Sequence, residues 1–436
     1  MIMKKWYVSV KKKFWFSQTA AILWLSCSVW LSLPWIKELS EITGLLLAIF
    51  IIAGIAYIPG FLNAFLVSSL LIDRQPPPKI KNPCLPVTVI IAAKNEEKNI
   101  ASTLSYIDKQ DYLGDIFVIV VDNGSEDHTS LIARQANAGL KTAISIVYEE
   151  NPGKYNALNR GIKETKTEFV LTLDADTILH KSAIRHIVSR IISSPDDVCA
   201  VAGTILARNS RDNLLTKMQE WDYFLGISAV KRLQGLYQGT LVAQGAFSLY
   251  RTEAIKEIGG WPEAIGEDIV LTWRLLHHKY RVYFEPLAVA FTEIPASFSH
   301  FAKQRSRWAR GMIEALKEMK PWQQPVLFAK FLTGINFIMP YLDFTYTFFW
   351  LPGLVLAFFG YFWIVGPMTL FVLPITFLSY FSIYTYQKRV FKELNLKVRK
   401  NTSGFFLFAL TYQIIMSPVS VWGYLQEFLK LRRIWK

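Results

Sequence analysis

Two long stretches near the start of the chain contain no formally charged residue. Residues 14–36 and residues 42–72 both lack Asp, Glu, Lys and Arg. A helix needs about 20 predominantly apolar residues to cross the hydrocarbon core. The pattern therefore predicts a membrane hairpin over residues 1–78. A cleaved signal peptide is the alternative for the first stretch, but no small-residue cleavage site follows it.

A second apolar region covers residues 326–436. Residues 344–387 carry no formal charge, which fits two spans broken near Gly366-Pro367. Residues 404–426 are one more candidate, so we expect about three spans here and five in all. Residues 326–343 fit either another span or a helix lying along the membrane interface.

Basic residues flank the first two predicted spans. They are Lys4, Lys5, Lys11, Lys12, Lys13, Arg74, Lys79 and Lys81. The positive-inside rule places both flanks in the cytoplasm and the hairpin around Lys37–Glu41 outside. The basic tail, residues 430–436, would lie outside in a five-span arrangement, against that rule.

Between these regions, residues 79–300 show a different pattern. After a Pro-rich linker, short β-branched runs alternate with helical periodicity. The predicted strands are 87–92, 116–122, 144–149 and 169–174, and the predicted helices lie near 97–110, 125–138, 154–165 and 180–193. This alternation predicts an α/β domain with a mostly parallel sheet that is covered on both faces.

Composition narrows the class of protein. The chain is 52% apolar and has a formal net charge of +14. Its cations cluster beside apolar runs and no nucleic-acid-binding module is visible, which favours a lipid bilayer as partner and argues against nucleic acid. Cys27, Cys84 and Cys199 form no CxxC pair, so neither a disulfide framework nor a zinc site is expected.

Polar residues follow three of the predicted strands. They are Asn95 and Glu96, Asp122 and Asn123, and Asp174 and Asp176. Ligands of parallel sheets bind beyond the carboxyl ends of the strands, so these residues predict one shared pocket. Neither a GxGxxG nor a GxxxxGK[ST] motif is present.

The acidic and basic residues of this pocket suggest chemistry on a phosphate-bearing substrate. Asp174 and Asp176 are hard oxygen ligands that can hold Mg²⁺ or Mn²⁺, although a solvated turn explains a lone DxD equally well. Lys154 opens a helix and suits an anion, or belongs to an ordinary first turn. Glu267 and Asp268 also open a predicted helix, where they either favour the helix dipole or supply a general base.

Residues 301–325 form a predicted amphipathic helix at the membrane edge. On a helix, one apolar stripe contains Phe301, Trp308, Met312, Ala315 and Met319, and a basic seam contains Lys303, Arg307, Arg310 and Lys317. That pattern is typical of a helix in the membrane interface. We expect Arg310 and Lys317 to serve the anchor, and Gln304, Arg307 and Trp308 to face the pocket.

Taken together, the motifs resemble those of the processive, inverting family 2 glycosyltransferases of membranes, which include cellulose, chitin, hyaluronan and poly-N-acetylglucosamine synthases. The motifs are AAKNEE, VDNGSEDHT, GKYNALN, LDADT, GAFSLYR, GED and QRSRW, between residues 92 and 308. The resemblance implies a GT-A (Rossmann-like) fold, a UDP-sugar donor and a growing polysaccharide acceptor. The resemblance is strongest for the bacterial poly-β-1,6-N-acetylglucosamine synthases. Only the resemblance to these synthases implies a small membrane subunit as partner.

The same resemblance implies a role for each matched residue. On the donor side, Asp122 would bind uracil, and Glu96 and Lys154 would bind the nucleotide; Asp174 and Asp176 would bind the diphosphate and the metal, and Arg307 would bind the diphosphate. On the acceptor side, the binding residues would be Gly245, Gln304, Arg307 and Trp308. Asp268 would be the base, with Glu267 beside it. Lys94 and Asn123 depart from the residues that many relatives carry, so contacts to the base are expected to differ there.

The resulting expectation is a multi-pass enzyme of the inner (plasma) membrane with a cytoplasmic catalytic domain. It would polymerise N-acetylglucosamine from UDP-GlcNAc into an exopolysaccharide and couple synthesis to export. Three alternatives stay open: a nonprocessive enzyme with a lipid-linked acceptor, a synthase that uses another UDP-sugar, and a transporter with a cytoplasmic domain.

Overall fold

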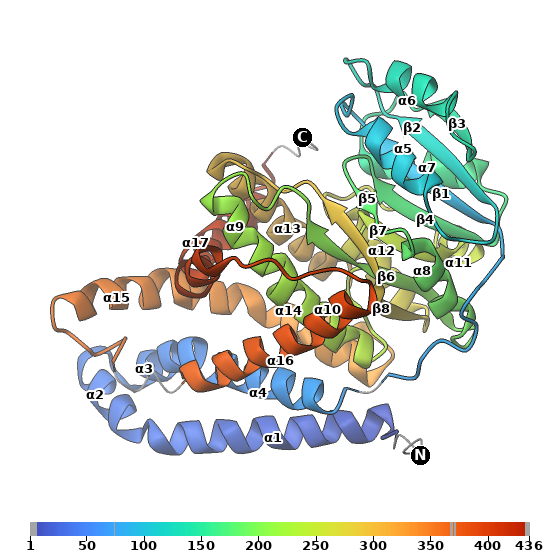
Figure 1. The fold of residues 1–436 in the computed structure, drawn as a ribbon. Helices are drawn as coiled ribbons and strands as arrows, with labels where there is room; N and C mark the ends of the chain where they lie inside the picture. The colour runs from blue at the N-terminus through green and yellow to red at the C-terminus, as the bar shows by residue number, and fades with distance from the viewer. Residues whose placement is uncertain (1–6, 74, 367–368, 370–371, 432–436) are drawn as a thin grey trace.

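The computed structural model describes residues 7–73, 75–366, 369 and 372–431. An α/β domain lies beside a layer of long helices that belong to both ends of the chain (Figure 1). Lys4, Lys5, Arg74, Pro367 and residues 432–436, on which several expectations depend, lie outside the described residues.

The N-terminal region forms the two long helical segments that the hairpin requires. Helix α1 (Val10–Leu31) is followed by α2 (Leu33–Thr43), α3 (Leu45–Ile52), the π-turn η1 (Ala53–Tyr57) and α4 (Ile58–Leu71). Helices α1 and α4 pack against each other (Figure 1). Val10–Leu31 and Leu45–Leu71 are both long and apolar enough to cross a membrane.

The C-terminal helices differ in their bounds from the expected spans. Helix α14 (Leu327–Thr345), the π-turn η4 (Tyr346–Trp350) and α15 (Leu351–Phe358) form one continuous segment, so residues 326–343 begin this segment instead of forming a span of their own. Helix α16 (Val372–Glu393) returns toward the α/β domain (Figure 1). Within the described residues, Leu327–Phe358 and α17 (Thr402–Phe428) are the C-terminal helices with the length and hydropathy of a span.

Both ends of α17 are bonded to helices of the α/β domain. At its start, Asn401 Nδ2 donates to the Lys217 carbonyl at 2.9 Å and to Glu220 Oε2 at 2.6 Å, on α9 (Leu214–Trp221). At its end, Lys317 Nζ on α13 (Phe298–Glu318) donates to Glu427 Oε1 at 2.9 Å. A helix that crosses a bilayer has its ends on opposite sides, and the expected span at 404–426 does not show this separation.

The α/β domain is built on one mixed, mostly parallel sheet of eight strands. The strands are β1 (Val87–Ala93), β2 (Ile116–Asp122), β3 (Ala143–Tyr148), β4 (Phe169–Asp174), β5 (Ile178–Leu179), β6 (Val198–Ala207), β7 (Phe247–Arg251) and β8 (Arg281–Thr292), in the order β3-β2-β1-β4-β7-β6-β8-β5. Strand β7 runs antiparallel to both neighbours, and β5 is antiparallel to β8. The predicted fold class is confirmed, and the four predicted strands are present within one residue at each end.

Helices cover both faces of the sheet, as a parallel sheet requires. The remaining helices of the domain are α5 (Ile100–Asp108), α6 (Thr129–Asn137), α7 (Lys154–Glu164), α8 (Ala183–Ile192), the π-turn η2 (Asp222–Ile227), α10 (Ser228–Leu236), α11 (Thr252–Glu257), α12 (Glu267–His277) and the 3₁₀ turn η3 (Pro321–Gln323). Every residue of β1 is buried; Ile90 packs into one apolar cluster, and Val89 and Ile91 into the other. Burial on both faces explains why this strand is an uninterrupted apolar run.

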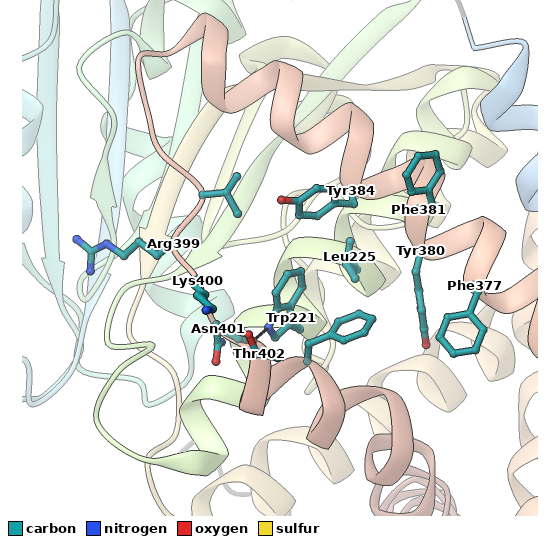
Figure 2. A pocket seen from close by; sticks show the side chains of 12 residues that line it. Trp221, Leu225, Phe377, Tyr380, Phe381, Tyr384, Arg399, Lys400, Asn401 and Thr402 are labelled. Atoms are coloured by element: carbon teal, nitrogen blue, oxygen red, sulfur yellow. Dashed lines mark hydrogen bonds between the residues drawn. The ribbon is translucent and has the colours of Figure 1, made fainter.

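A cavity of about 690 Å³ lies where the α/β domain meets α16 and α17 (Figure 2). Its aromatic wall consists of Trp221, Phe377, Tyr380, Phe381, Tyr384 and Phe405, with Arg399 and Lys400 beside it. None of the residues that the sequence predicts for catalysis lines this cavity. The candidate chemistry lies instead at the edge of the sheet.

Candidate active site

The register of the sheet brings the strand-end carboxylates to one edge. Strand β1 lies between β2 and β4, with Ala93 opposite Asp122 and Ala92 opposite Asp174. Strand β7 adds to this edge from the opposite direction, because Phe247 pairs with Leu173 and the preceding residues reach Asp174. The predicted convergence of parallel strand ends is therefore present, and an antiparallel strand completes it.

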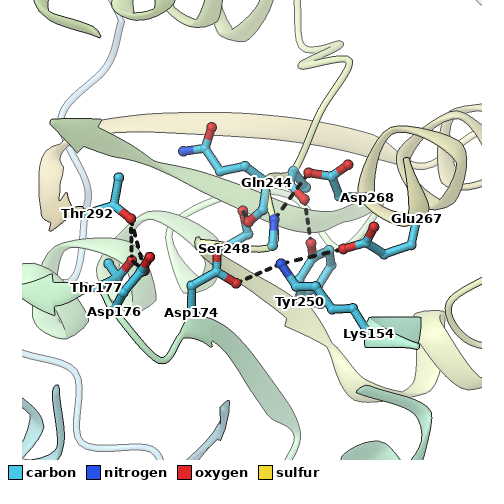
Figure 3. Close-up of polar contacts among 12 residues, drawn as sticks. Lys154, Asp174, Asp176, Thr177, Gln244, Ser248, Tyr250, Glu267, Asp268 and Thr292 are labelled. Carbon is cyan, nitrogen blue, oxygen red and sulfur yellow. Dashed lines mark hydrogen bonds and ion pairs between the residues drawn. The ribbon is translucent and has the colours of Figure 1, made fainter. Parts of the chain in front are cut away.

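Lys154 occupies the centre of this edge (Figure 3). Its Nζ donates to Asp174 Oδ1 at 2.6 Å and lies 3.5 Å from Glu267 Oε1. Burial alone lowers the Lys154 pKa, but the Asp174 and Glu267 carboxylates outweigh it and raise the pKa above its ordinary value. The loop before α7 is held by Asn123 Oδ1, which accepts from the Gly153 N–H at 2.8 Å. Lys154 is thus a fixed cation between two acidic elements.

Gly245 allows Lys154 to approach this closely. A Cβ atom at position 245 would lie 2.7 Å from Lys154 Nζ and 3.2 Å from its Cε. The end of a lysine side chain usually moves aside, but this one is held by Asp174 and Glu267. The resemblance implies that Gly245 shapes the acceptor site; the structure shows that Gly245 leaves room for the Lys154 side chain.

Asp176 lies beside Asp174 in a setting that favours an added cation (Figure 3). Burial, and then the negative charges of Asp174 and Glu96, raise the pKa of Asp176 to about 7. Thr177 and Thr292 both donate to Asp176 Oδ1, each at 3.1 Å. A divalent cation there would relieve the repulsion between carboxylates that otherwise raises this pKa.

Glu267 and Asp268 begin α12 and face the same space as Lys154. Burial raises the pKa of Glu267 to about 7, although Lys154 opposes that shift. Asp268 is half-buried; its Oδ1 accepts from the Ile269 N–H at 2.8 Å and its Oδ2 from the Gly245 N–H at 3.3 Å. Asp268 is thus held at the N-terminus of α12, with each carboxylate oxygen bonded to a backbone N–H group.

The contact between α12 and α13 was not predicted from the sequence. Glu314 Oε2 accepts from the N–H groups of Ile265 at 2.8 Å and Gly266 at 3.1 Å, just before α12. A Cβ at Gly311 would lie 2.7 Å from Gly266 Cα, so the two backbones touch. Gly311 and Glu314 lie nearly one turn apart on α13, but no local pattern shows that this face meets residue 266.

Helix α13 carries the predicted acceptor residues on the side of α12. Gln304 Oε1 is buried and has no hydrogen-bond partner among the described residues. Arg307 opposes the rise in the pKa of Glu267 by its charge, so it lies close to that carboxylate. Trp308 is 42% exposed and presents part of its ring to solvent.

Arg310 does not belong to a surface anchor, and that expectation is wrong. It is buried, and its Nη2 donates to the Leu431 carbonyl at 2.9 Å and to Glu427 Oε2 at 3.4 Å. The helical pattern placed Arg310 beside Lys317 on a basic seam, but α17 supplies the acidic partner that makes its burial tolerable.

Asp122 and Glu96 lie at the same edge and shape its loops. Asp122 is buried; its Oδ1 accepts from the Ser125 N–H at 2.9 Å, and Ser130 donates to its other oxygen. Glu96 Oε2 accepts from Asn99 Nδ2 at 3.1 Å. These contacts fix the two acids at the ends of β2 and β1, and the charge of Glu96 also acts on Asp176.

The arrangement fits a cation that is shared with a phosphate-bearing substrate. No group of three or more His, Cys, Asp or Glu side chains within the described residues is placed to hold a metal by itself. Mg²⁺ commonly binds through one or two carboxylates, substrate phosphates and water. Asp174 Oδ2 and Asp176 Oδ2 make no hydrogen bond among the described residues, and both are suitable ligands.

Lys231 is a buried amine on α10 near Asp268. Its Nζ donates to the Val242 carbonyl, and burial lowers its pKa to about 7, with the Asp268 charge opposing that shift. Lys231→Met removes the titrating group and keeps an unbranched side chain of similar size. This variant tests the cost of burying the amine.

Between about pH 7 and 10, unfolded Lys231 binds a proton that the folded form does not hold, so wild-type stability falls as pH falls. The stability of Lys231→Met relative to wild type should therefore grow by roughly 3 kcal/mol from about pH 9.5 to 7, and then level off. Thermal unfolding in detergent across this range measures the effect. A difference in melting temperature that does not depend on pH would contradict the assignment.

The comparisons with known proteins agree with this geometry. Residues 83–311 match the family described as "Glycosyltransferase like family 2". The chain is 32% identical over 266 residues to the poly-beta-1,6-N-acetyl-D-glucosamine synthase of Staphylococcus aureus (strain COL). The aligned residues make up 60% of this chain and 64% of that protein. It is 32% identical over 231 residues to the same synthase of Staphylococcus epidermidis, with 53% and 55% covered. The chain thus matches less than two thirds of the length of these relatives.

One solved structure has the same overall fold. It is the mannosyltransferase PcManGT from Pyrobaculum calidifontis in complex with GDP-Man and Mn²⁺. The TM-score is 0.61 at 19% identity, and the match covers 88% of this chain and 98% of that chain. This likeness includes the α/β domain and helices beyond it.

Proposed function

The chain belongs to the glycosyltransferase-like family 2, and from this premise we propose that it transfers N-acetylglucosamine from UDP-GlcNAc to a growing β-1,6-linked chain. One observation carries the proposal. Asp268, at the start of α12, lies near the Lys154–Asp174 pair, and Glu314 bonds the start of α12 to α13, the helix that bears Gln304, Arg307 and Trp308. A base, a phosphate-binding cation and a sugar-binding surface then border one space. The sugar and linkage rest on the Staphylococcus synthases.

The proposed reaction is a single displacement. Asp268 takes the proton from the acceptor hydroxyl, and that oxygen forms a bond to the anomeric carbon of the donor sugar. The bond from this carbon to UDP breaks on the opposite side, so the configuration inverts and UDP leaves with the electron pair. Lys154 and Arg307 would offset the negative charge that develops on the diphosphate.

Asp174 and Asp176 would hold a divalent cation in this site. Bound there, Mg²⁺ or Mn²⁺ supplies Lewis-acid stabilisation to the leaving diphosphate. Glu96 would contribute negative charge nearby, since its charge already raises the pKa of Asp176.

Metal removal should abolish most of the activity. In excess EDTA, transfer from UDP-GlcNAc should fall by roughly a hundredfold or more, and added Mg²⁺ or Mn²⁺ should restore it. Asp176→Asn should raise the metal concentration needed for half-maximal rate. Full activity in the chelator, after exhaustive dialysis, would remove the cation from the proposal.

Product analysis tests the function itself. Purified protein in lipid nanodiscs should be given UDP-GlcNAc, UDP-Glc and UDP-GlcA separately, and the products digested with a β-1,6-specific N-acetylglucosaminidase. We expect a long polymer from UDP-GlcNAc alone that this hydrolase degrades. Single-sugar products would favour the nonprocessive alternative, a polymer from another donor would change the substrate, and no UDP release with any donor would refute the enzyme.

We further propose that the chain crosses the inner membrane four times, with the α/β domain in the cytoplasm. The crossings would be α1, α3 to α4, α14 to α15, and α16, while α17 lies in the interface. Helix α16 has a lower hydropathy than the other three, but most of it belongs to the uncharged run 344–387. The bonds from both ends of α17 to the α/β domain support this arrangement. An even number of crossings also places the basic tail on the same side as Lys11–Lys13, as the positive-inside rule requires.

Cysteine labelling of intact cells distinguishes four crossings from five. After replacement of the three native cysteines, Glu38→Cys in α2 should react with a membrane-impermeant maleimide, whereas Lys430→Cys should react only after the membrane is opened. Labelling of Lys430→Cys in sealed cells would establish an odd number of crossings.

A further inference from the structure

Arg305 is a fully enclosed cation in the middle of the 304–308 motif. It is 2% exposed, and its Nη2 donates to Asp222 Oδ2 at 2.7 Å. Asp222 starts the π-turn η2 and also accepts a hydrogen bond from Tyr412 on α17. Burying two charges has a desolvation penalty that an apolar pair of similar volume would avoid. The pair therefore calls for an explanation beyond stability.

The guanidinium of Arg305 is surrounded by aromatic rings. Its central carbon lies 4.1 Å from the centre of the Trp308 ring, 5.2 Å from that of Phe301 and 5.6 Å from that of Tyr223. Phe301 and Tyr223 are buried, whereas Trp308 is 42% exposed. One side of the Trp308 ring thus rests on a fixed planar cation, and the rest of the ring remains available to a ligand.

A second polar group lies one helical turn before Trp308, at Gln304. Gln304 Oε1 is buried without a hydrogen-bond partner among the described residues, and such an atom costs free energy unless a donor reaches it. Sugars present hydroxyl donors beside apolar faces, so a ring such as Trp308 next to a carbonyl acceptor suits a pyranose.

We propose that Arg305 is a positioning residue, which Asp222 holds in place so that its guanidinium fixes the Trp308 ring as the platform for the acceptor sugar. The proposal rests on the proposed function, since the acceptor is taken from it. Arg305 itself contacts neither donor nor acceptor.

Arg305→Lys tests the planar group while it keeps the charge. Lysine can still pair with Asp222 but offers no flat face to Trp308. The dissociation constant of a β-1,6-linked N-acetylglucosamine pentasaccharide, measured by calorimetry in nanodiscs with UDP present, should rise about five- to tenfold. The KM for UDP-GlcNAc and the melting temperature should stay close to wild type.

Arg310→Lys is the matched control. Arg310 is buried on the same helix and pairs with an acid, Glu427, whereas the cation that lies over the Trp308 ring is Arg305. We expect this variant to bind the pentasaccharide as wild type does. Equal weakening in both arginine variants would overturn the positioning role.

A double-mutant cycle with Trp308→Phe shows whether Arg305 acts through Trp308. If it does, the double variant should bind the pentasaccharide about as weakly as Trp308→Phe alone. Additive losses in the double variant would refute the proposal. So would a rise in the KM for UDP-GlcNAc and a lower melting temperature in Arg305→Lys alongside its weaker acceptor binding. Wild-type protein that neither binds nor extends the pentasaccharide would refute the proposed function instead.

Discussion

Asp268→Asn should lower the turnover of sugar transfer by about 10²–10⁴-fold, the usual contribution of a positioned general base. Asparagine has the size of aspartate, and its single oxygen can still accept from either Ile269 N–H or Gly245 N–H. Its amide cannot take the proton of the acceptor hydroxyl. The loss should therefore fall on the chemical step and spare the fold.

Release of UDP and formation of polymer, both measured in nanodiscs, check this expectation. The melting temperature and the KM for UDP-GlcNAc should change little. Asp196→Asn is a suitable control, because the Asp196 side chain is fully exposed and its ion pair with Arg251 is long, at 4.0 Å. Turnover of Asp268→Asn within a fewfold of this control would remove Asp268 from the role of base and direct attention to Glu267.

The parallel half of the sheet could be predicted because its signals are local. Strand β1 is an apolar run since both of its faces are buried, and the helices after the first four strands keep a helical period. Once strands are parallel, their carboxyl ends must meet at one edge. The convergence of Asp122, Asp174 and Lys154 follows from that rule.

The antiparallel half carries weaker local signals. Strand β7 is short and appeared in the sequence as the motif around Gly245, not as a strand. Strand β8 contains Glu285 and Pro286, which interrupt its apolar pattern. Proline cannot donate to a ladder and is therefore a poor mark of a strand. The direction of β7, which brings Gly245 beside Asp174, depends on partners distant in the sequence.

Charged residues on α13 show a second limit of local patterns. Helical periodicity places Arg310 beside Lys317 correctly, but its burial depends on Glu427, far along the chain. The same holds for Arg305 and Asp222. An apolar stripe predicts that a helix is amphipathic; it does not show which cations a later segment will cover.

Hydropathy has a similar limit for α17. Its composition satisfies the length and hydropathy of a span, yet Asn401 and Glu427 bond its two ends to the α/β domain. Asp343 on α14 also accepts from Ser417 at 3.0 Å and Tyr424 at 2.7 Å on α17. An apolar helix can lie at the interface when other helices cover part of it, and composition alone does not separate the two cases.

Gly311→Ala should disturb the geometry of the active site by separating α12 from α13. An added Cβ would lie 2.7 Å from Gly266 Cα and 3.1 Å from Gly266 N, and both are backbone atoms that cannot turn aside. Helices α12 and α13 must separate, which also stretches the bonds from Glu314 to the start of α12. Asp268 then moves relative to Trp308. We expect a loss of about 1–3 kcal/mol in stability and roughly a hundredfold in transfer rate.

Gly334→Ala is the matched control, since Gly334 lies within α14 and a Cβ there would meet no atom within 4 Å. Alanine is favoured over glycine inside a helix by roughly 0.5–1 kcal/mol, so this variant should be neutral or slightly stabilised. Activity and melting temperature measured on both variants separate steric contact from helix propensity. If Gly311→Ala kept wild-type turnover, the contact between α12 and α13 would not set the geometry of the site. If Gly311→Ala lost stability but kept the wild-type rate per folded molecule, the contact between α12 and α13 would contribute to stability alone.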